Sequence, residues 1–266
     1  MITLGVIGIG NMGKAIINGV LNSNFSKEIK IFAYDKNSSS HAELKQKGIK
    51  FTDTAIDIVK SCTYVLLAVK PQNIEDLLSE IKNAVTEKTV FISICAGISA
   101  EYIEQRTLKD VKVILVMPNT PMMLGVGASA VSKNNKVSES EFKFAMSIFE
   151  SCGLAVEIPI DKMKEIIAIN GSSPAFIYLF AKGFIDYAKS VDIDENSALK
   201  LFAKSLEGSA KMITSSGMSI DELIQQVSSP GGTTIAGLEE FLSNDLTGIV
   251  KKAANSCTKR AYELQK

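Results

Sequence analysis

An apolar run leads into the stretch Gly8-Ile9-Gly10-Asn11-Met12-Gly13, and a helical pattern begins as this stretch ends. Glycines at this spacing between a strand and a helix are typical of a turn that binds a dinucleotide. Gly8 permits the tight turn, Gly10 lets a pyrophosphate approach the backbone, and Gly13 lets the helix lie close to the strand. We therefore predict a dinucleotide site at residues 8–13, although a glycine turn without a ligand would share the pattern.

The first half of the chain alternates apolar strands with amphipathic helices. We expect helices over residues 12–22, 73–84, 100–108 and 138–150, and one more that is opened by the capping-box spacing Ser40-x-x-Glu43. We expect strands over residues 2–8, 29–34, 63–68, 89–94 and 111–117, with short late strands over 128–131 and 155–158. Strands this apolar are buried on both faces, which predicts a parallel sheet covered by helices.

Strand signals stop after about Asp161, and the rest of the chain has helical patterns. They cover residues 164–191 with a bend expected at Pro174, 194–215, 220–227 after a capping box at Ser219-x-x-Glu222, and 235–265 with a break near Asn244. We predict an α/β fold, with an N-terminal Rossmann-type dinucleotide-binding domain over residues 1–160 and an all-helical domain over residues 161–266. The apolar content of these helices favours packing between subunits, and a thick monomeric core is the alternative.

The composition limits the classes of function. Lys and Arg number 29 and Asp and Glu number 29, so the 266 residues have no net charge, and we expect neither a nucleic-acid surface nor a membrane surface. The longest charge-free apolar segment, residues 166–181, is shorter than the ~20 residues that a membrane span needs. The start lacks the basic residues of a signal peptide, so we expect a soluble cytoplasmic protein.

Few side chains are available for acid–base or metal chemistry. The cysteines lie far apart without a CxxC pair and are expected to be small core residues: Cys62, Cys95, Cys152 and Cys257. His41 is the single histidine and belongs to a polar helix start. Neither a Ser-His-Asp triad nor a zinc site can be assembled, so we expect no metal site. The chemistry must then come from a cofactor that the protein orients.

Polar groups follow several strands at their carboxyl ends, where open α/β sheets bind ligands. Asp35 can accept hydrogen bonds from ribose hydroxyls and repels a 2′-phosphate, which favours NADH, whereas the neighbouring Lys36 favours NADPH. Asp35 could instead be only a turn residue. The next strands are followed by Val69-Lys70-Pro71 and by Cys95-Ala96-Gly97. Lys70 would orient the ribose or the phosphates, or it is a solvated loop lysine.

A second cluster of turn-forming residues, Ser228-Ser229-Pro230-Gly231-Gly232-Thr233-Thr234, stands between two helical patterns. Proline removes a backbone donor and glycines let the backbone bend, so the amides of residues 231–234 can converge before a helix expected from Ile235. Such a nest at a helix N-terminus stabilises an anion, which predicts a site for a small carboxylate. A third cluster, Gly171-Ser172-Ser173-Pro174-Ala175, suits either a kink with close packing or room for a ligand.

Together these motifs resemble those of the pyrroline-5-carboxylate reductase family, nearly end to end. The matching stretches are residues 8–13, Ala68-Val69-Lys70-Pro71, Ala96-Gly97, Asn119-Thr120-Pro121, Gly171-Ser172-Ser173-Pro174-Ala175 and residues 229–234. The resemblance implies reduction of the cyclic imine 1-pyrroline-5-carboxylate to L-proline by NADH or NADPH, the last step of proline biosynthesis. It also implies a homodimer formed through the helical domain, which in this family is often assembled further into a decamer.

The resemblance also implies roles for single residues. Residues Ala68–Pro71 and Cys95–Ala96 would contact the cofactor. Gly232 and Thr233 would present amides to the substrate carboxylate, and Ser229 would line the same substrate site. Thr234 would be the catalytic residue, hydrogen-bonded to the ring nitrogen while a hydride is transferred to the imine carbon.

The chain departs from the family pattern at three positions. Asp35 stands where NADPH-using members often tolerate the phosphate, and Ala55 stands where some members have an asparagine that helps hold it, so both favour NADH. Gln226 stands where some members have an asparagine near the cofactor. Two other functions stay open. A related reductase of a hydroxy acid would usually have a catalytic lysine near residues 171–173, and a non-catalytic dinucleotide sensor would need no second anion site.

Overall fold

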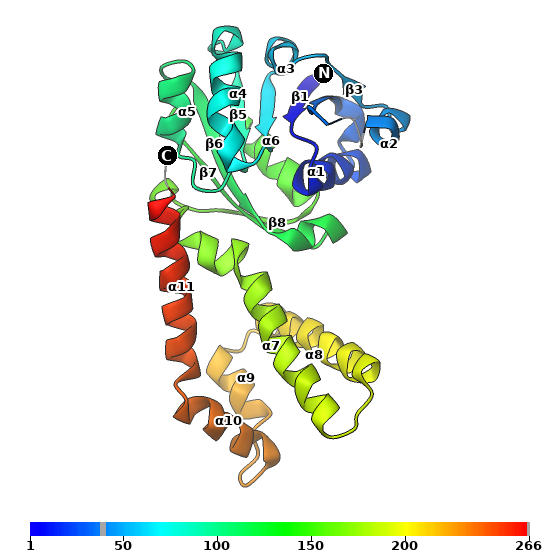
Figure 1. The fold of residues 1–266 in the computed structure, drawn as a ribbon, viewed down its shortest axis with the longest axis vertical. Coiled ribbons are helices and arrows are strands. Elements are labelled where there is room, and N and C mark those ends of the chain that lie inside the picture. Colours follow the sequence, from blue (N-terminus) through cyan, green and yellow to red (C-terminus); the bar gives the residue numbers. More distant parts are fainter. Residues whose placement is uncertain (38–40, 265–266) are drawn as a thin grey trace. The chain divides into compact units, whose positions relative to one another are not determined.

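A computed structural model describes residues 1–37 and 41–264 of the chain (Figure 1). The chain divides into two compact units. The first unit comprises residues 1–172 together with the carboxyl-terminal residues from Cys257 onward, and the second comprises residues 173–256. The capping box expected at Ser40 lies outside the described residues.

Within the described residues, the first unit holds an eight-stranded sheet with the order β3-β2-β1-β4-β5-β6-β7-β8. The strands are β1 Ile2–Ile7, β2 Ile29–Tyr34, β3 Lys50–Phe51, β4 Tyr64–Leu67, β5 Val90–Ser93, β6 Lys112–Pro118, β7 Gly127–Lys133 and β8 Gly153–Glu157. Neighbouring strands are parallel except β6 and β7, which are antiparallel. The order from β3 to β6 is that of a doubly wound dinucleotide-binding sheet, which confirms the predicted fold class.

Helices cover both faces of this sheet. They are α1 Asn11–Asn22, α2 His41–Gln46, α3 Ala55–Ser61, α4 Ile74–Ile81, α5 Ala100–Arg106 and α6 Glu139–Glu150. Because side chains alternate along a strand, Leu4 and Val6 of β1 pack in one core with α1, α2 and α6. Ile7 packs in the other core, with α3, α4 and α5. The sequence pattern missed β3 and α3, because two and seven residues are too few to show a period.

The register of the sheet brings three strand ends to one edge. Ile7 is paired with Tyr34 of β2 on one side and with Leu67 of β4 on the other. The residues that follow these strands therefore lie together, and they are Gly8, Asp35 and Ala68. This edge is where the sequence predicts the dinucleotide.

The second unit is built from helices: α7 Ser173–Ser190, α8 Glu195–Ser215, α9 Ile220–Gln226, α10 Thr233–Ser243 and the first part of α11 Leu246–Glu263. The break expected near Asn244 separates α10 from α11, and Ser219 forms the expected capping box with Glu222. The bend expected at Pro174 lies two residues earlier, at Ser172. A π-helical turn at Ile167–Gly171 comes first, and Pro174 lies in the first turn of α7, where a missing amide breaks no helical hydrogen bond.

The helical unit has almost no core of its own. Of residues 173–256, all of which the structure describes, Pro174 and Ala188 alone are buried. Large apolar side chains are exposed instead, among them Leu179 and Leu201, each at 71%. Apolar faces this extensive mark an interaction surface. No helix of the described chain combines the length and apolar character that crossing a membrane requires.

Candidate active site

The glycine-rich turn after β1 is closed at two positions and open at the third. Gly8 has a φ of +101°, and a Cβ there would lie 2.6 Å from the Ala68 carbonyl oxygen. A Cβ on Gly13 would lie 2.2 Å from the Gly8 carbonyl oxygen, so only glycine lets α1 approach β1 this closely. A Cβ on Gly10 would meet nothing within 4 Å, and Gly10 is the N-cap of α1 without a side-chain capping bond. The open amides at the start of α1 fit a pyrophosphate.

A cavity of about 540 Å³ lies beside this turn. Its wall includes six of the residues predicted to bind the cofactor: Gly8, Gly10, Asp35, Ala68, Val69 and Lys70. It also includes residues that sequence reasoning did not single out as ligands: Tyr34, Asn73, Asp76, Leu77 and Glu80. The last three belong to α4, and the signal that could have found them is that α4 follows the loop after β4.

Asp35 is bound to the glycine-rich turn itself. Its Oδ2 accepts a hydrogen bond from the Ile9 amide at 2.5 Å, and its Oδ1 accepts one from the Asn37 amide at 2.7 Å. Asp35 therefore has the turn-forming role, and it is also one of the residues that line the cavity. Ala55 differs, because its side chain is completely buried in the core with α3 and does not reach this wall.

Cys95 connects the ends of β4 and β5. Its thiol donates to the carbonyl oxygens of Val69 at 3.3 Å and Leu67 at 3.5 Å. Burial raises the pKa of this thiol to about 11, so the thiol is neutral at pH 7 and unsuited to nucleophilic chemistry. The neighbouring Ala96 is exposed. Cys95 thus fixes the loop that carries Ala96.

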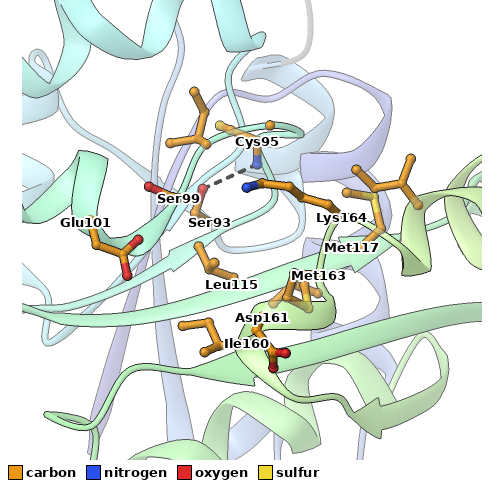
Figure 2. A pocket seen from close by; sticks show the side chains of 14 residues that line it. Ser93, Cys95, Ser99, Glu101, Leu115, Met117, Ile160, Asp161, Met163 and Lys164 are labelled. Atoms are coloured by element: carbon orange, nitrogen blue, oxygen red, sulfur yellow. Dashed lines mark hydrogen bonds between the residues drawn. The ribbon is translucent and has the colours of Figure 1, made fainter. Parts of the chain in front are cut away.

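A second cavity, of about 270 Å³, lies beside Cys95, which is one of the residues that line it (Figure 2). It is lined by the ends of β5 and β6, the start of α5 and the segment from Ile160 to Ile167. Figure 2 shows the Lys164 side chain extended into this cavity toward Cys95. The Ser93 hydroxyl oxygen accepts a hydrogen bond from the Cys95 amide at 3.3 Å, which holds the first residues of the loop.

Two asparagines connect the end of β6 to the π-helical turn. Asn170 Nδ2 donates to the carbonyl oxygens of Met117 at 2.6 Å and Ala128 at 3.0 Å. Asn119 Nδ2 donates to Asn170 Oδ1 at 3.2 Å. A Cβ on Gly171 would lie 3.2 Å from Met117 Sδ. These contacts support close packing as the role of the small residues that begin at Gly171.

The predicted anion-binding nest is the turn between α9 and α10. Gly231 has a φ of +71°, and the Gly232 amide donates to the Ser229 carbonyl oxygen at 2.9 Å. A Cβ on Gly232 would lie 2.6 Å from the Ser229 hydroxyl oxygen. Helix α10 begins at Thr233, not at Ile235 as expected, and Gly232 is its N-cap without a side-chain capping bond. The amides of Thr233 and Thr234 therefore lie in the first helical turn, where no intrahelical partner exists for them.

The other predicted residues are exposed or are hydrogen-bonded within their own segment. Lys70 is exposed and precedes the 3₁₀ turn Pro71–Asn73. Thr234 and Gln226 are exposed, the latter at the end of α9. The Ser228 hydroxyl donates to the Ile224 carbonyl oxygen at 2.7 Å and is used within its own helix end. Among the residues that the structure describes, no group of three His, Cys, Asp or Glu side chains could hold a metal ion.

Comparison with known proteins adds sequence relatives. Residues 3–97 match the family described as NADP oxidoreductase, coenzyme F420-dependent, and residues 161–264 match the family described as pyrroline-5-carboxylate reductase dimerisation. The pyrroline-5-carboxylate reductase of Methanosarcina acetivorans is 34% identical over 99% of this chain and 98% of its own length. That of Escherichia coli K12 is 30% identical over 99% of this chain and 98% of its own length.

Solved structures agree with this relationship. The pyrroline-5-carboxylate reductase of Coxiella burnetii has a TM-score of 0.92 and 28% identity, over 99% of this chain and 98% of its own. The Plasmodium falciparum pyrroline carboxylate reductase with NADP bound has a TM-score of 0.89 and 28% identity, over 100% and 98%. With curated relatives aligned along almost the whole chain, this protein belongs to the pyrroline-5-carboxylate reductase family of NAD(P)-dependent oxidoreductases.

Proposed function

We propose that this chain reduces 1-pyrroline-5-carboxylate to L-proline with NADH or NADPH, the last step of proline biosynthesis. The observation that carries the proposal is the turn Ser229–Gly232, which leads directly into a helix whose first residues are Thr233 and Thr234. It offers amides for a carboxylate and a hydroxyl beside them, as an imine carboxylate requires. A dinucleotide sensor would need no such second site.

Residues of the first unit would hold the cofactor. The amides after Gly10 would bind the pyrophosphate, and Asp35 would accept hydrogen bonds from the adenosine ribose. The loops Ala68–Pro71 and Cys95–Ala96 would contact the rest of the dinucleotide. When bound, the dihydronicotinamide supplies the hydride. The cavity wall fits this role because the backbone at Gly10 has open space beside it, where a Cβ would meet nothing within 4 Å.

Residues of the nest would hold the substrate. The Thr233 amide binds the carboxylate, with the positive end of the α10 dipole behind it. The Gly232 amide already donates to Ser229, and a Cβ on Gly232 would lie 2.6 Å from the Ser229 hydroxyl oxygen, so in this arrangement Gly232 contributes mainly by letting the turn close tightly. The Thr234 hydroxyl donates to the ring nitrogen, which gains electron density as the imine is reduced, and stabilises it or relays a proton to it. No strongly basic side chain is required.

A preference for NADH is part of the proposal. The carboxylate of Asp35 lines the cavity and repels a 2′-phosphate, while Lys36 in the same wall acts in the opposite direction. The buried Ala55 adds little to this choice, because its side chain does not reach the wall. The P. falciparum relative with NADP bound makes preference for NADPH the natural alternative outcome.

The family match to a dimerisation domain implies that the chain associates with itself. We propose a homodimer, with assembly into a decamer as its higher form. We also propose a boundary near residue 160 between the dinucleotide-binding domain and the substrate-binding and dimerisation domain, which is supported by the family match that begins at residue 161. The proposed location is the cytoplasm, where this biosynthetic step would use the cell's NAD(P)H.

The test is to follow dihydronicotinamide absorbance after adding pyrroline-5-carboxylate, with NADH and NADPH in separate reactions. We expect loss of absorbance with formation of proline, and faster loss with NADH at equal concentration. No loss with either cofactor would remove the reductase proposal, and turnover of keto acids in its place would favour the hydroxy-acid alternative. A large preference for NADPH would remove only the role of Asp35 in cofactor choice.

A further inference from the structure

The carboxyl-terminal end of the chain packs on the loop that follows β5. Helix α11 begins in the second unit, but the residues from Cys257 onward belong to the first. Gly97 has a φ of +78°, and a Cβ there would lie 3.4 Å from the Leu264 carbonyl oxygen and 3.8 Å from Leu264 Cβ. Leu264 therefore lies beside Gly97, the residue that directly follows Cys95 and Ala96.

Tyr262 fixes the end of α11 at a second point. Its hydroxyl donates to Glu165 Oε1 at 2.8 Å, and Lys164 Nζ lies 4.3 Å from the centroid of its ring. The hydrogen bond to Glu165 is the main cause that raises the pKa of the Tyr262 hydroxyl, because the carboxylate favours the protonated donor. Ala261, beside it, is buried. A charge-assisted hydrogen bond and a cation–π contact thus hold the same side chain.

Each of these two anchors lies next to a residue that lines the same cavity. Gly97 and Lys164 both line the 270 Å³ cavity beside Cys95, and Figure 2 shows Lys164 there. Leu264 lies beside Gly97, and the Tyr262 ring contacts Lys164. The end of the chain therefore ties the loop after β5 to the segment that contains Lys164 and Glu165.

We propose that the end of α11 together with Leu264, residues 257–264, is a strap that holds the loop Cys95–Gly97 in the conformation that binds the cofactor, with Tyr262 as a positioning residue. The inference rests on the cofactor contacts proposed above for Cys95 and Ala96. A loop that is already ordered before binding raises affinity, because no conformational entropy is lost in ordering the loop when the ligand binds. Since neither Tyr262 nor Leu264 is assigned a contact with the cofactor, their loss should change cofactor binding and spare the chemical step.

Two variants and one control test the strap in the full assembly. Tyr262→Phe removes only the hydroxyl, and a chain that ends at Ala261 removes both anchors. Lys259→Ala changes an exposed residue of the same helix and is the matched control. The dissociation constant of NADH and NADPH is measured by dihydronicotinamide fluorescence. We expect it to rise about threefold in Tyr262→Phe and about tenfold in the shortened chain, where tenfold corresponds to about 1.4 kcal/mol, with kcat at saturating cofactor within about twofold of wild type.

A double variant makes the test independent of how the shortened chain folds. Glu165→Gln combined with Tyr262→Phe should weaken cofactor binding no more than the larger single effect, because both changes act on the same hydrogen bond. Unchanged affinity in Tyr262→Phe, or a loss of kcat without a loss of affinity, would overturn the strap. A wild-type protein that binds no dinucleotide would count against the proposed function instead.

Discussion

The two units of this chain bury their apolar residues in opposite ways. In the first unit, helices cover both faces of the sheet, and side chains such as Phe91 and Phe149 are 0% exposed. In the second unit, Leu179 and Leu201 are each 71% exposed, and Phe184 is still 40% exposed although it stacks on Phe202 at 4.4 Å. The first unit therefore gains its stability from its own interior. The second leaves its apolar faces exposed within one chain, and its match to a dimerisation family implies that self-association covers them.

The largest expected effect is loss of self-association when a charge is placed on the exposed apolar face. Leu201→Glu should weaken association by on the order of 3–5 kcal/mol, because a carboxylate would be buried in the contact without a partner. Sedimentation velocity over a range of protein concentrations measures it. Lys200→Glu, which changes an exposed polar neighbour, is the control and should keep the wild-type mass. An unchanged mass for Leu201→Glu would place this face outside the interface.

The next effect separates the two kinds of stability. Phe149→Ala opens the core between the sheet and α6 and should lower the free energy of unfolding by about 3–5 kcal/mol. Because this core lies within one subunit, the loss should be the same at every protein concentration. Tyr178→Ala in the helical unit should instead show a loss that depends on concentration. Denaturant titrations at two protein concentrations measure both losses. If the loss depends on protein concentration in the same way for both variants, the comparison is contradicted.

The units also differ in the chemistry we assign to them, and Thr234→Ala tests this division. Removal of the hydroxyl should lower kcat about 100-fold, as loss of one preorganised donor does in other active sites. The dissociation constant of the cofactor should stay at its wild-type value, since the dinucleotide residues lie in the first unit. Thr234→Ser should restore most of the rate, and Thr247→Ala is the control at another exposed threonine. Unchanged steady-state kinetics would remove Thr234 from the mechanism.

The comparison also explains which features could be predicted from the sequence. The sheet of the first unit follows from long apolar strands, and the cavity residues Gly8, Asp35 and Val69 follow from the rule that parallel strands end at one edge. The α4 residues Asp76 and Glu80 could not be predicted to line this cavity, because their position depends on how α4 packs on the sheet. Strand β3 was missed because two residues carry no period.

The second half of the chain was harder to predict for a different reason. A helical period predicts a helix but not the π-helical turn at Ile167–Gly171, because that turn has the same pattern of apolar residues as the helix around it. The contact of Tyr262 with Glu165 spans 97 residues of sequence and leaves no local signal. The turn before Thr233 was predictable, because proline and glycine at fixed positions specify it.

A smaller effect is expected from Asp35→Ser, which tests the nucleotide side of the comparison. The change removes a negative charge from the cavity wall, so the ratio of kcat/KM for NADH to that for NADPH should fall about tenfold, near the 1.4 kcal/mol that such a ratio represents. Lys36→Ala should move the ratio in the opposite direction. The KM for the imine should not change in either variant, since the nest lies in the other unit. A ratio that stays constant in both variants would show that this wall does not read the 2′-phosphate.

The smallest effect concerns alkaline pH and belongs to the core of the first unit. Burial raises the pKa of the Cys62 thiol to about 12 and of the Cys95 thiol to about 11, from an ordinary value of 9.0. Above pH 9 the unfolded chain loses these protons before the folded chain does, so the stability present below pH 9 is lost as the pH rises toward 11 for Cys95 and toward 12 for Cys62. At pH 10 each thiol should lower the free energy of unfolding by about 1 kcal/mol. In denaturant titrations between pH 8 and 10.5, Cys95→Ala should show a shallower fall than wild type. An equal slope would mean that the buried thiols do not set the alkaline limit of this unit.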